Sequence, residues 1–316
     1  MDKNEESGSD ATRRIGRRTA LRAFGAVGSG LFGARLGLAS SDAASAQERF
    51  PPSERTDWGP PRRLGEGSIA TFFTEGRSGA PRYLGVWFTA DALSGLPGDE
   101  TPAGEESGNE ASNAEESPVH LTELPLPEAA RNATPIRWIT ADWNPEGHVP
   151  RDVYDVPHFD FHFYLMPRQL VRSEIRPGEC DVDEDGTPDA GVPCDVLERG
   201  TEPLPPLQQP PGYAPTDDIV PFMGNHWVNQ QAPEFRGEQF THTWIYGSFD
   251  GELTFLEPMV ATDYLENLRG REIADVATPD AFPRQGFYPT QYVIRYLRRQ
   301  DAYVVFLRRF QLFEGT

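Results

Sequence analysis

The chain has 316 residues, enough for one large or two modest domains with a sizeable buried core. Its formal net charge is −20, and Lys3 is the only lysine among 29 basic residues. Binding to nucleic acid or to an anionic membrane surface needs a basic footprint, so this charge balance excludes both kinds of partner. An acid excess almost without lysine is typical of halophilic proteins, in which carboxylates hold water at the surface.

Residues 1–46 have the features of a twin-arginine signal peptide. Two arginine pairs at 13–18 precede a glycine- and alanine-rich apolar run, and the small residues at 44–46 resemble a cleavage site. The run is too rich in glycine for a good permanent span, although an uncleaved anchor stays open. We expect an extracellular or cell-surface protein that begins near Gln47 and has no other contact with the membrane.

The mature chain begins with an extended lead at 47–64, rich in proline and arginine. A single β-rich domain is expected over 65–316. Its first hairpin joins strand-like runs at 68–75 and 81–93 through the turn signal GRSGAP. Residues 97–118 contain many carboxylates and no large apolar side chain, so we expect a disordered acidic insertion within the domain.

The rest of the chain continues the strand pattern. Alternating runs predict a hairpin over 241–260 and another over 290–310, while 262–270 is a short helix-like segment. With no internal repeat and little helical periodicity, the fold class is mostly β: an antiparallel sandwich or barrel with a few short helices.

The stretch PHFDFHFY, residues 157–164, alternates three phenylalanines with His158, Asp160 and His162. On a strand, alternate residues share a face, so the polar three line one side and the phenylalanines the other. A helix would scatter the phenylalanines around its circumference. Residues four apart on a strand lie about 13 Å apart, so His158 and His162 need ligands from other strands to complete an ion site.

Two other segments supply candidates. His226 follows Gly-Asn, a turn that can present a side chain inward. In the 241–260 hairpin, Asp250-Gly251 is a favoured two-residue turn. Counting outward from that turn sets Trp244 opposite Glu257 and places His242 on the same face, diagonal to Glu257.

These residues predict a metal site. Three imidazoles with one carboxylate are a donor set typical of zinc or a similar divalent ion, and an open fourth position would let the ion activate water. The carboxylates would serve as general base, as a fourth ligand or as outer partners of the imidazoles. The convergent residues are expected to be His162, His226 and His242 with Asp160 or Glu257, and His158 is a further metal ligand candidate beside Asp160.

The alternative is a metal-free polar core. A single histidine on a strand is more often a packed or hydrogen-bonded residue than a ligand. His120 and His148 stand in loop-like settings and are given no role.

The two cysteines bound an acidic stretch within the loop 177–215. In an exported protein they are predicted to form a disulfide. The sequence between them, DVDEDGTPDAGVP, has the DxDxDGxxD spacing of a calcium loop, but it lacks the closing glutamate and the flanking helices of an EF-hand. The alternative is a solvated halophilic loop. The disulfide residues are Cys180 and Cys194, and the calcium candidates are Asp181, Asp183, Asp185 and Asp189, with Asp195 available to close the shell.

A resemblance to a known family rests on four motifs: DWNPEGHVP, VYDVPHFDFHFY, MGNHW and FTHTWIYGSFDGELTFLEPM. From about Gly65 to the C-terminus the chain resembles a family of exported prokaryotic proteins described as a domain of unknown function, one Thermus member of which is regulated by an extracytoplasmic sigma factor. No particular enzymatic activity can be carried over to this chain from the resemblance. The acidic insertion and the Cys-bounded loop depart from the family pattern, so a calcium site would be an addition of this branch. The implied motif positions are His158, Asp160, His162, His226, His242 and Glu257.

Two functions fit these predictions. The first is an exported metal-binding β-domain protein with a zinc-type centre and a structural calcium loop; an activity, if present, would be that of a metal-dependent hydrolase or lyase on a small-molecule substrate. The second is a non-enzymatic structural or interaction protein of the cell exterior, including a homo-oligomer, with a metal-free histidine core. If metal and calcium only hold an interaction surface or an oligomer together, solvent access to the ion separates that role from the first. A metal-free core predicts no change in stability with a chelator.

Overall fold

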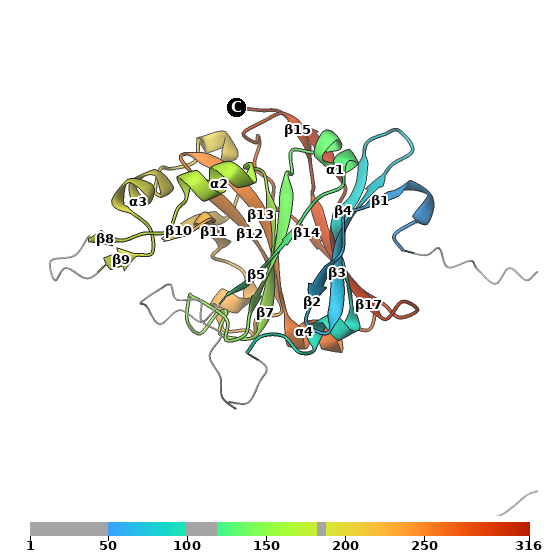
Figure 1. Cartoon of the computed structure of the whole chain (residues 1–316). Helices are drawn as coiled ribbons and strands as arrows, with labels where there is room; N and C mark the ends of the chain where they lie inside the picture. Colours follow the sequence, from blue (N-terminus) through green and yellow to red (C-terminus); the bar gives the residue numbers. More distant parts are fainter. Residues whose placement is uncertain (1–49, 99–118, 182–187) are drawn as a thin grey trace, which may run out of the picture. The chain divides into compact units, whose positions relative to one another are not determined.

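Alternating hydrophobicity builds two antiparallel sheets of seven strands that face each other (Figure 1). A computed structural model of the protein describes residues 50–98, 119–181 and 188–316, without the side chains of residues 181–190. The unit from Glu48 to Thr316 is compact. Both sheets have open edges in the described ranges, so the fold is a sandwich, and the predicted mostly β class with short helices is confirmed.

The first sheet comprises, in spatial order, β1 (Thr56–Trp58), β3 (Gly67–Glu75), β4 (Pro81–Thr89), β17 (Ala302–Arg308), β16 (Gln291–Leu297) and β14 (Arg271–Asp275), with β2 (Arg62–Leu64) paired to β3. The second comprises β10 (Tyr213–Val220), β11 (Gly224–Asn229), β12 (His242–Phe249), β13 (Glu252–Ala261), β7 (His158–Tyr164), β6 (Trp138–Asn144) and β5 (His120–Leu124). Two small ribbons pair β8 (Cys180–Asp181) with β9 (Pro188–Ala190) and β15 (Gly286–Tyr288) with β18 (Gln311–Phe313). The helices are α1 (Glu128–Ala133), α2 (Arg168–Glu174), α3 (Cys194–Gly200) and α4 (Thr262–Asn267), with 3-10 turns at Ser53–Arg55, Ala90–Leu93, Pro206–Gln208 and Pro233–Arg236.

The main core lies between the sheets. The three phenylalanines of β7 point into it, and Phe159 and Phe161 lie 6.3 and 6.0 Å, between ring centroids, from Phe88 of β4. Burial of each such ring contributes about 1.5–3 kcal/mol, which fixes the orientation of the strand. The opposite face of β7 therefore carries its three polar residues, as the alternation predicts.

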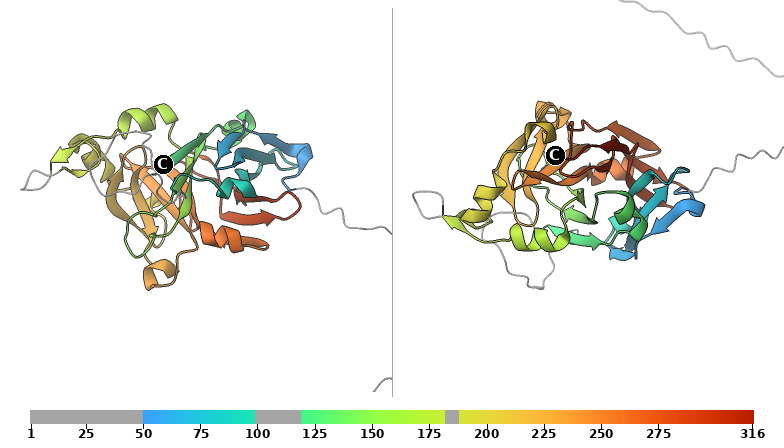
Figure 2. Two further views of the ribbon diagram at one scale, coloured as in Figure 1. Left: turned by 60° about the horizontal axis from the view of Figure 1, so that its bottom comes forward. Right: turned by 90° about the horizontal axis from the view of Figure 1, so that it is seen from above.

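The outer face of the second sheet is covered as well. Helices α2 and α3 lie against it near one end (Figures 1 and 2), where Val171 and Phe255 join one apolar cluster. Toward the other end, Tyr154 and Phe240 from two loops pack on Ile245. Every residue of β6 and β7 is buried as a result. The polar row of β7 thus lies inside the protein, between two apolar coverings.

The predicted register of the β12–β13 hairpin is wrong by one residue. Phe249 pairs with Glu252 next to the turn, as expected, but a β-bulge at Thr254 then shifts the pairing, and Ile245 lies opposite Glu257. A one-residue shift exchanges the two faces of a strand. Consequently Trp244 points into the core between the sheets, while Glu257 lies on the outer face.

The lead expected to precede the domain contributes β1 and β2 to the first sheet. Cys180 and Cys194 form the predicted disulfide, with their Cα atoms 4.6 Å apart. The signal peptide at 1–46 and nearly all of the acidic insertion at 97–118 fall outside the described residues. Within the described ranges, no helix combines the length and apolar character needed to span a membrane.

Candidate metal centre

Two neighbouring strands place a polar row on the outer face of the second sheet. On β7 the row is His158, Asp160 and His162, and on β6 the alternation of ITADWN places Thr140, Asp142 and Asn144 opposite them. On the other side of β7, the register of β13 sets Glu257 opposite His162. Carboxylates, imidazoles and an amide are therefore gathered on three adjacent strands.

The first centre consists of His148, His158 and Asp160, whose potential ligand atoms lie within 4.8 Å of one another. The Asp160 carboxylate is central. Its Oδ1 lies 3.1 Å from Nε2 of His158, and its Oδ2 accepts a hydrogen bond of 3.2 Å from Nε2 of His148. Asn144 donates a hydrogen bond of 2.7 Å to Oδ2, which holds the carboxylate in this orientation.

Backbone acceptors orient both imidazoles of the first centre. Nδ1 of His158 lies 2.7 Å from the Val156 carbonyl, and Nδ1 of His148 lies 2.7 Å from the Val149 carbonyl. A carbonyl only accepts, so in each ring Nδ1 carries the proton. Nε2 of His148 donates to Oδ2 of Asp160 as well, and it offers a lone pair only once that second proton is lost. Metal-binding histidines commonly have this arrangement, because the outer hydrogen bond fixes both tautomer and ring orientation.

The second centre consists of His162, His226 and Glu257, again with candidate ligand atoms within 4.8 Å of one another. Nε2 of His162 lies 3.5 Å from Oε1 of Glu257. On the other side of the ring, Nδ1 of His162 lies 3.0 Å from Oδ2 of Asp142. The order carboxylate, imidazole, ligand group is that of a metal-binding histidine supported by an outer carboxylate.

An aromatic wall keeps the rings of the second centre in place. Phe255 lies 4.7 Å from His162 and 5.4 Å from His226 between ring centroids. Gly247 on β12 makes room for Phe255, because a Cβ at this position would collide with the phenyl ring. Because Gly247 has no side chain, the ring of Phe255 can lie over it and contact both His226 on β11 and His162 on β7.

Several polar atoms of these residues lack hydrogen bonds although they are buried. Among the described residues, 12 buried side-chain nitrogen and oxygen atoms have no hydrogen-bond partner, and seven of them belong to this cluster. Each such atom costs about 1–3 kcal/mol unless something else satisfies it. The seven are Asp142 Oδ1, Asn144 Oδ1, His158 Nε2, Asp160 Oδ1, His162 Nδ1, His162 Nε2 and Glu257 Oε2.

The distances between these atoms offer a reason for their lack of hydrogen bonds. His158 Nε2 and Asp160 Oδ1 are only 3.1 Å apart, yet neither atom makes a hydrogen bond. Two ligands at about 2.05 Å from a tetrahedral zinc ion are separated by about 3.3 Å. The separations between nitrogen and oxygen without a hydrogen bond, 3.1 Å in the first centre and 3.5 Å in the second, are close to an edge of such a coordination shell. Each of the two groups could therefore hold one metal ion.

Electrostatics of the first centre favour a cation. Burial alone would raise the pKa of Asp160, but the charges of His158 and His148 outweigh it and hold this pKa well below 3.8. Burial would lower the pKa of His148, but the Asp160 carboxylate outweighs it and raises the pKa to about 9. A positive charge beside Asp160 is therefore strongly stabilised.

The second centre combines opposite shifts. Burial would lower the pKa of His162, but Glu257 and Asp142 together raise it to about 9. Burial, followed by the charges of His162 and His148, lowers the pKa of His226 to about 3, so this ring stays neutral at physiological pH. Burial raises the pKa of Asp142, and it raises the pKa of Glu257 to about 8. Without a cation, the centre must retain protons to remain buried.

A pocket of about 130 Å³ opens onto both centres. His148 and Asp160 of the first centre and His226 of the second line it, together with Asn144. Its remaining wall is mainly apolar, with Ile245 among the buried residues. Both centres thus border the pocket.

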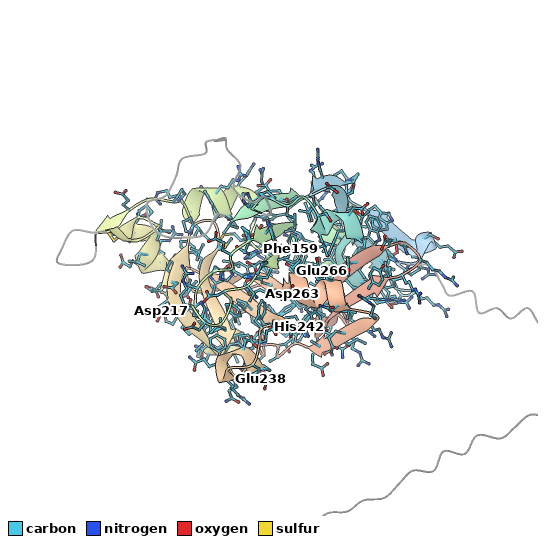
Figure 3. The ribbon with its side chains drawn as sticks, turned by 90° about the horizontal axis from the view of Figure 1, so that it is seen from below. Phe159, Asp217, Glu238, His242, Asp263 and Glu266 are labelled. Atoms are coloured by element: carbon cyan, nitrogen blue, oxygen red, sulfur yellow. A yellow bond between two sulfur atoms is a disulfide. The ribbon has the colours of Figure 1, made fainter. Side chains whose placement is uncertain are left out.

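The convergence of three imidazoles predicted from the sequence is wrong for His242. The bulge turns this side chain to the opposite face of the sheet, where its Nδ1 lies 2.7 Å from the Tyr292 hydroxyl. It packs beside α4, 5.1 Å from the ring of Tyr264 (Figure 3). His162, His226 and Glu257 do come together.

Sequence reasoning missed three residues. His148 was assigned no role because it lies in a loop, and periodicity carries no information there. Asp142 and Asn144 were detectable, because they alternate with Ile139, Ala141 and Trp143 as the polar residues of β7 alternate with phenylalanines.

The calcium prediction falls largely outside the described residues. Asp183 and Asp185 lie within 182–187, and the side chains of Asp181 and Asp189 are not described, so the site stays a prediction. Asp195, which was expected to close the shell, instead accepts two hydrogen bonds from Arg176, of 2.7 and 2.9 Å.

Comparison of the chain with protein-family models, with curated proteins and with solved structures gives no match, so the site stands on its own geometry.

Proposed function

We propose that this chain is a metal-binding protein whose two adjacent centres each hold a divalent ion of the zinc type. One observation carries the proposal: buried imidazole and carboxylate atoms approach one another at ligand-to-ligand distances without forming hydrogen bonds. A metal-free polar core would pair these atoms, since unpaired buried groups are costly. One ion at each centre would satisfy the ligand atoms among them, Nε2 of His158 and Oδ1 of Asp160 in the first and Nε2 of His162 in the second.

The donor set supports zinc over calcium or magnesium. Each centre offers two imidazoles and one carboxylate, whereas calcium and magnesium prefer all-oxygen shells. Two histidines with one glutamate or aspartate also form one of the common open zinc sites. Asp160 and Glu257, predicted as general bases, serve in this proposal as ligands, and Asp142 and Asn144 orient His162 and Asp160.

The pocket favours a reactive role over a purely structural one. Structural zinc sites have four protein ligands and no access, whereas each of these centres gathers three candidate ligands from the described part of the chain and borders a cavity. An ion there would supply Lewis-acid chemistry, which suits hydrolysis, hydration or elimination. The cavity restricts the substrate to a small molecule or to the end of a larger one.

Cobalt substitution distinguishes the two roles. Cobalt(II) in a tetrahedral site absorbs visible light, and the spectrum changes when an exogenous ligand such as azide binds. We expect azide to shift the spectrum of the cobalt protein and Ile245→Trp, which fills the pocket, to abolish the shift while retaining cobalt. A spectrum insensitive to azide in the wild-type protein would favour the structural role.

We further propose that the protein works outside the cytoplasm after twin-arginine export. The Cys180–Cys194 disulfide supports this, because disulfides persist in oxidising compartments. The twin-arginine route carries folded proteins, which fits a centre loaded before export. Membership of the exported prokaryotic family and halophilic adaptation of the surface belong to the same proposal. Replacing both arginine pairs with lysine should retain the protein in the cytoplasm, and continued export would contradict it.

A further inference from the structure

A second pocket lies on the outer face of the first sheet, far along the fold from the metal centres. Its volume is about 250 Å³, and strands β4, β14, β16 and β17 form its floor. Phe50, from the lead before β1, covers one side and packs on Phe306 with ring centroids 4.8 Å apart. Aromatic rings thus line the cavity beside its arginines.

Four arginines line this pocket, in a chain whose net charge is −20. Arg82 and Arg271 are exposed, whereas Arg295 and Arg308 are half-buried. In the described ranges of the chain, none of the four has an ion pair, although other arginines pair with carboxylates. In so acidic a protein, four unpaired guanidinium groups around one cavity call for an explanation.

The arrangement of the arginines is unfavourable without an anion. Arg271 and Arg295 lie directly opposite each other on β14 and β16, where like charges destabilise a sheet. Burial, followed by the charge of Arg271, lowers the pKa of Arg295. Nε of Arg308 is buried and has no hydrogen-bond partner in the described part of the chain. The cavity thus contains half-buried positive charge and a buried donor atom without a partner.

Aromatic rings hold two of the guanidinium groups in place. Arg295 lies over the ring of Phe50 at 5.1 Å, and Arg82 lies over the ring of Tyr83 at 4.9 Å. Stacking fixes the plane of a guanidinium group and leaves its N–H edge free to donate. Planar, pre-oriented guanidinium groups match the paired oxygens of phosphate, sulfate or carboxylate.

We propose that this pocket binds a small anionic ligand, with a tetrahedral oxyanion on the arginines and a ring or apolar portion against the aromatic floor. A volume of about 250 Å³ accommodates a monosaccharide or phenyl ring that carries one phosphate or sulfate group. The ligand neutralises the Arg271–Arg295 pair and accepts from Arg308. The site is independent of the metal centres, which lie on the other sheet.

Calorimetric titration with phenyl phosphate, phenyl sulfate, inorganic phosphate and neutral phenol tests the proposal. We expect one saturable site for phenyl phosphate or phenyl sulfate, weaker binding of inorganic phosphate, and none of phenol. The preferred ester identifies the anion. Absence of saturable binding by every anion would overturn the proposal, as would equal binding of phenol.

Two exposed arginines provide variants that leave the core untouched. Arg82→Gln and Arg271→Gln should each weaken binding about tenfold, because each removes a charge-assisted hydrogen bond. Arg299→Gln, with the same charge change in the exposed β16–β17 turn, is the matched control and should bind as wild type. An equal loss in all three variants would mean that general charge attracts the ligand and would refute a built site. His162→Ala must also bind as wild type; a loss there would place the anion at the metal centres.

Discussion

Zinc binding should strengthen steeply as pH rises from 6.5 toward about 9. In the metal-free protein the pKa of both His148 and His162 is about 9, against an ordinary value of 6.5, because Asp160 in one centre and Glu257 and Asp142 in the other stabilise the imidazolium. A zinc ion must displace that proton from each ring, so acid competes with the metal.

The size of the gain in zinc affinity follows from the pH interval between the ordinary and the raised histidine pKa. Each displaced proton changes the apparent affinity tenfold per pH unit, or about 1.4 kcal/mol. Over the interval from 6.5 to about 9 the gain is roughly 300-fold, or about 3 kcal/mol, at each centre. His226, with a pKa lowered to about 3, carries no proton in this range and adds no pH dependence.

The metal-free protein should show the opposite trend in this interval. A raised histidine pKa contributes stability that is fully present below the unfolded value of 6.5 and is lost as pH rises through the folded value of about 9. Deprotonation leaves buried carboxylates without a positive partner. Alkaline pH therefore destabilises the metal-free form while it strengthens zinc binding, and the thermal stabilisation by zinc grows with pH.

Competition with a chromophoric chelator across this interval, corrected for the protons of the chelator, measures the affinity. Calorimetry in two buffers of different ionisation enthalpy counts the protons released per ion. We expect at least one proton to be released per zinc ion near neutral pH. The zinc affinity of His242→Ala should depend on pH as that of the wild-type protein does. An affinity independent of pH, or zinc binding that releases no proton, would refute the assignment of these histidines as ligands.

Three further results are expected. Asp142→Asn should weaken zinc binding about 10- to 100-fold with little change in fold, as measured by chelator competition, because the amide orients His162 less firmly. Gly247→Ala should displace Phe255 and reduce zinc affinity and thermal stability together; unchanged values would show that the ring does not position the centre. Serine at both cysteines should lower the free energy of unfolding by about 3 kcal/mol in denaturant titrations, and a loss below about 1 kcal/mol would contradict the loop-closure estimate.

Local periodicity predicted the part of the site that lies on one strand. The alternation of PHFDFHFY determines which side chains share a face, and burial of Phe159 and Phe161 determines which face turns outward. The same rule applied to ITADWN would have added Asp142 and Asn144. Positions on a single strand are therefore accessible from sequence, because the period of two is a property of the backbone.

Relations between strands were less accessible. The bulge at Thr254 has no mark in the sequence, yet it exchanges the faces of β12 and removes His242 from the site. The contribution of His148 depends on how a loop folds back over β7, which is set by tertiary packing of Tyr154 and not by any local pattern. Both errors concern how distant segments meet, where packing decides.

Elemental analysis of the purified, folded protein tests the central claim most directly. After incubation with zinc and removal of free metal, the wild-type chain should retain two ions. His162→Ala and His148→Ala should each lose one, whereas His242→Ala, which removes a half-buried imidazole from the other face of the sheet, should retain both. A wild-type protein without bound metal, or ions lost from His242→Ala but kept by His162→Ala, would contradict the account.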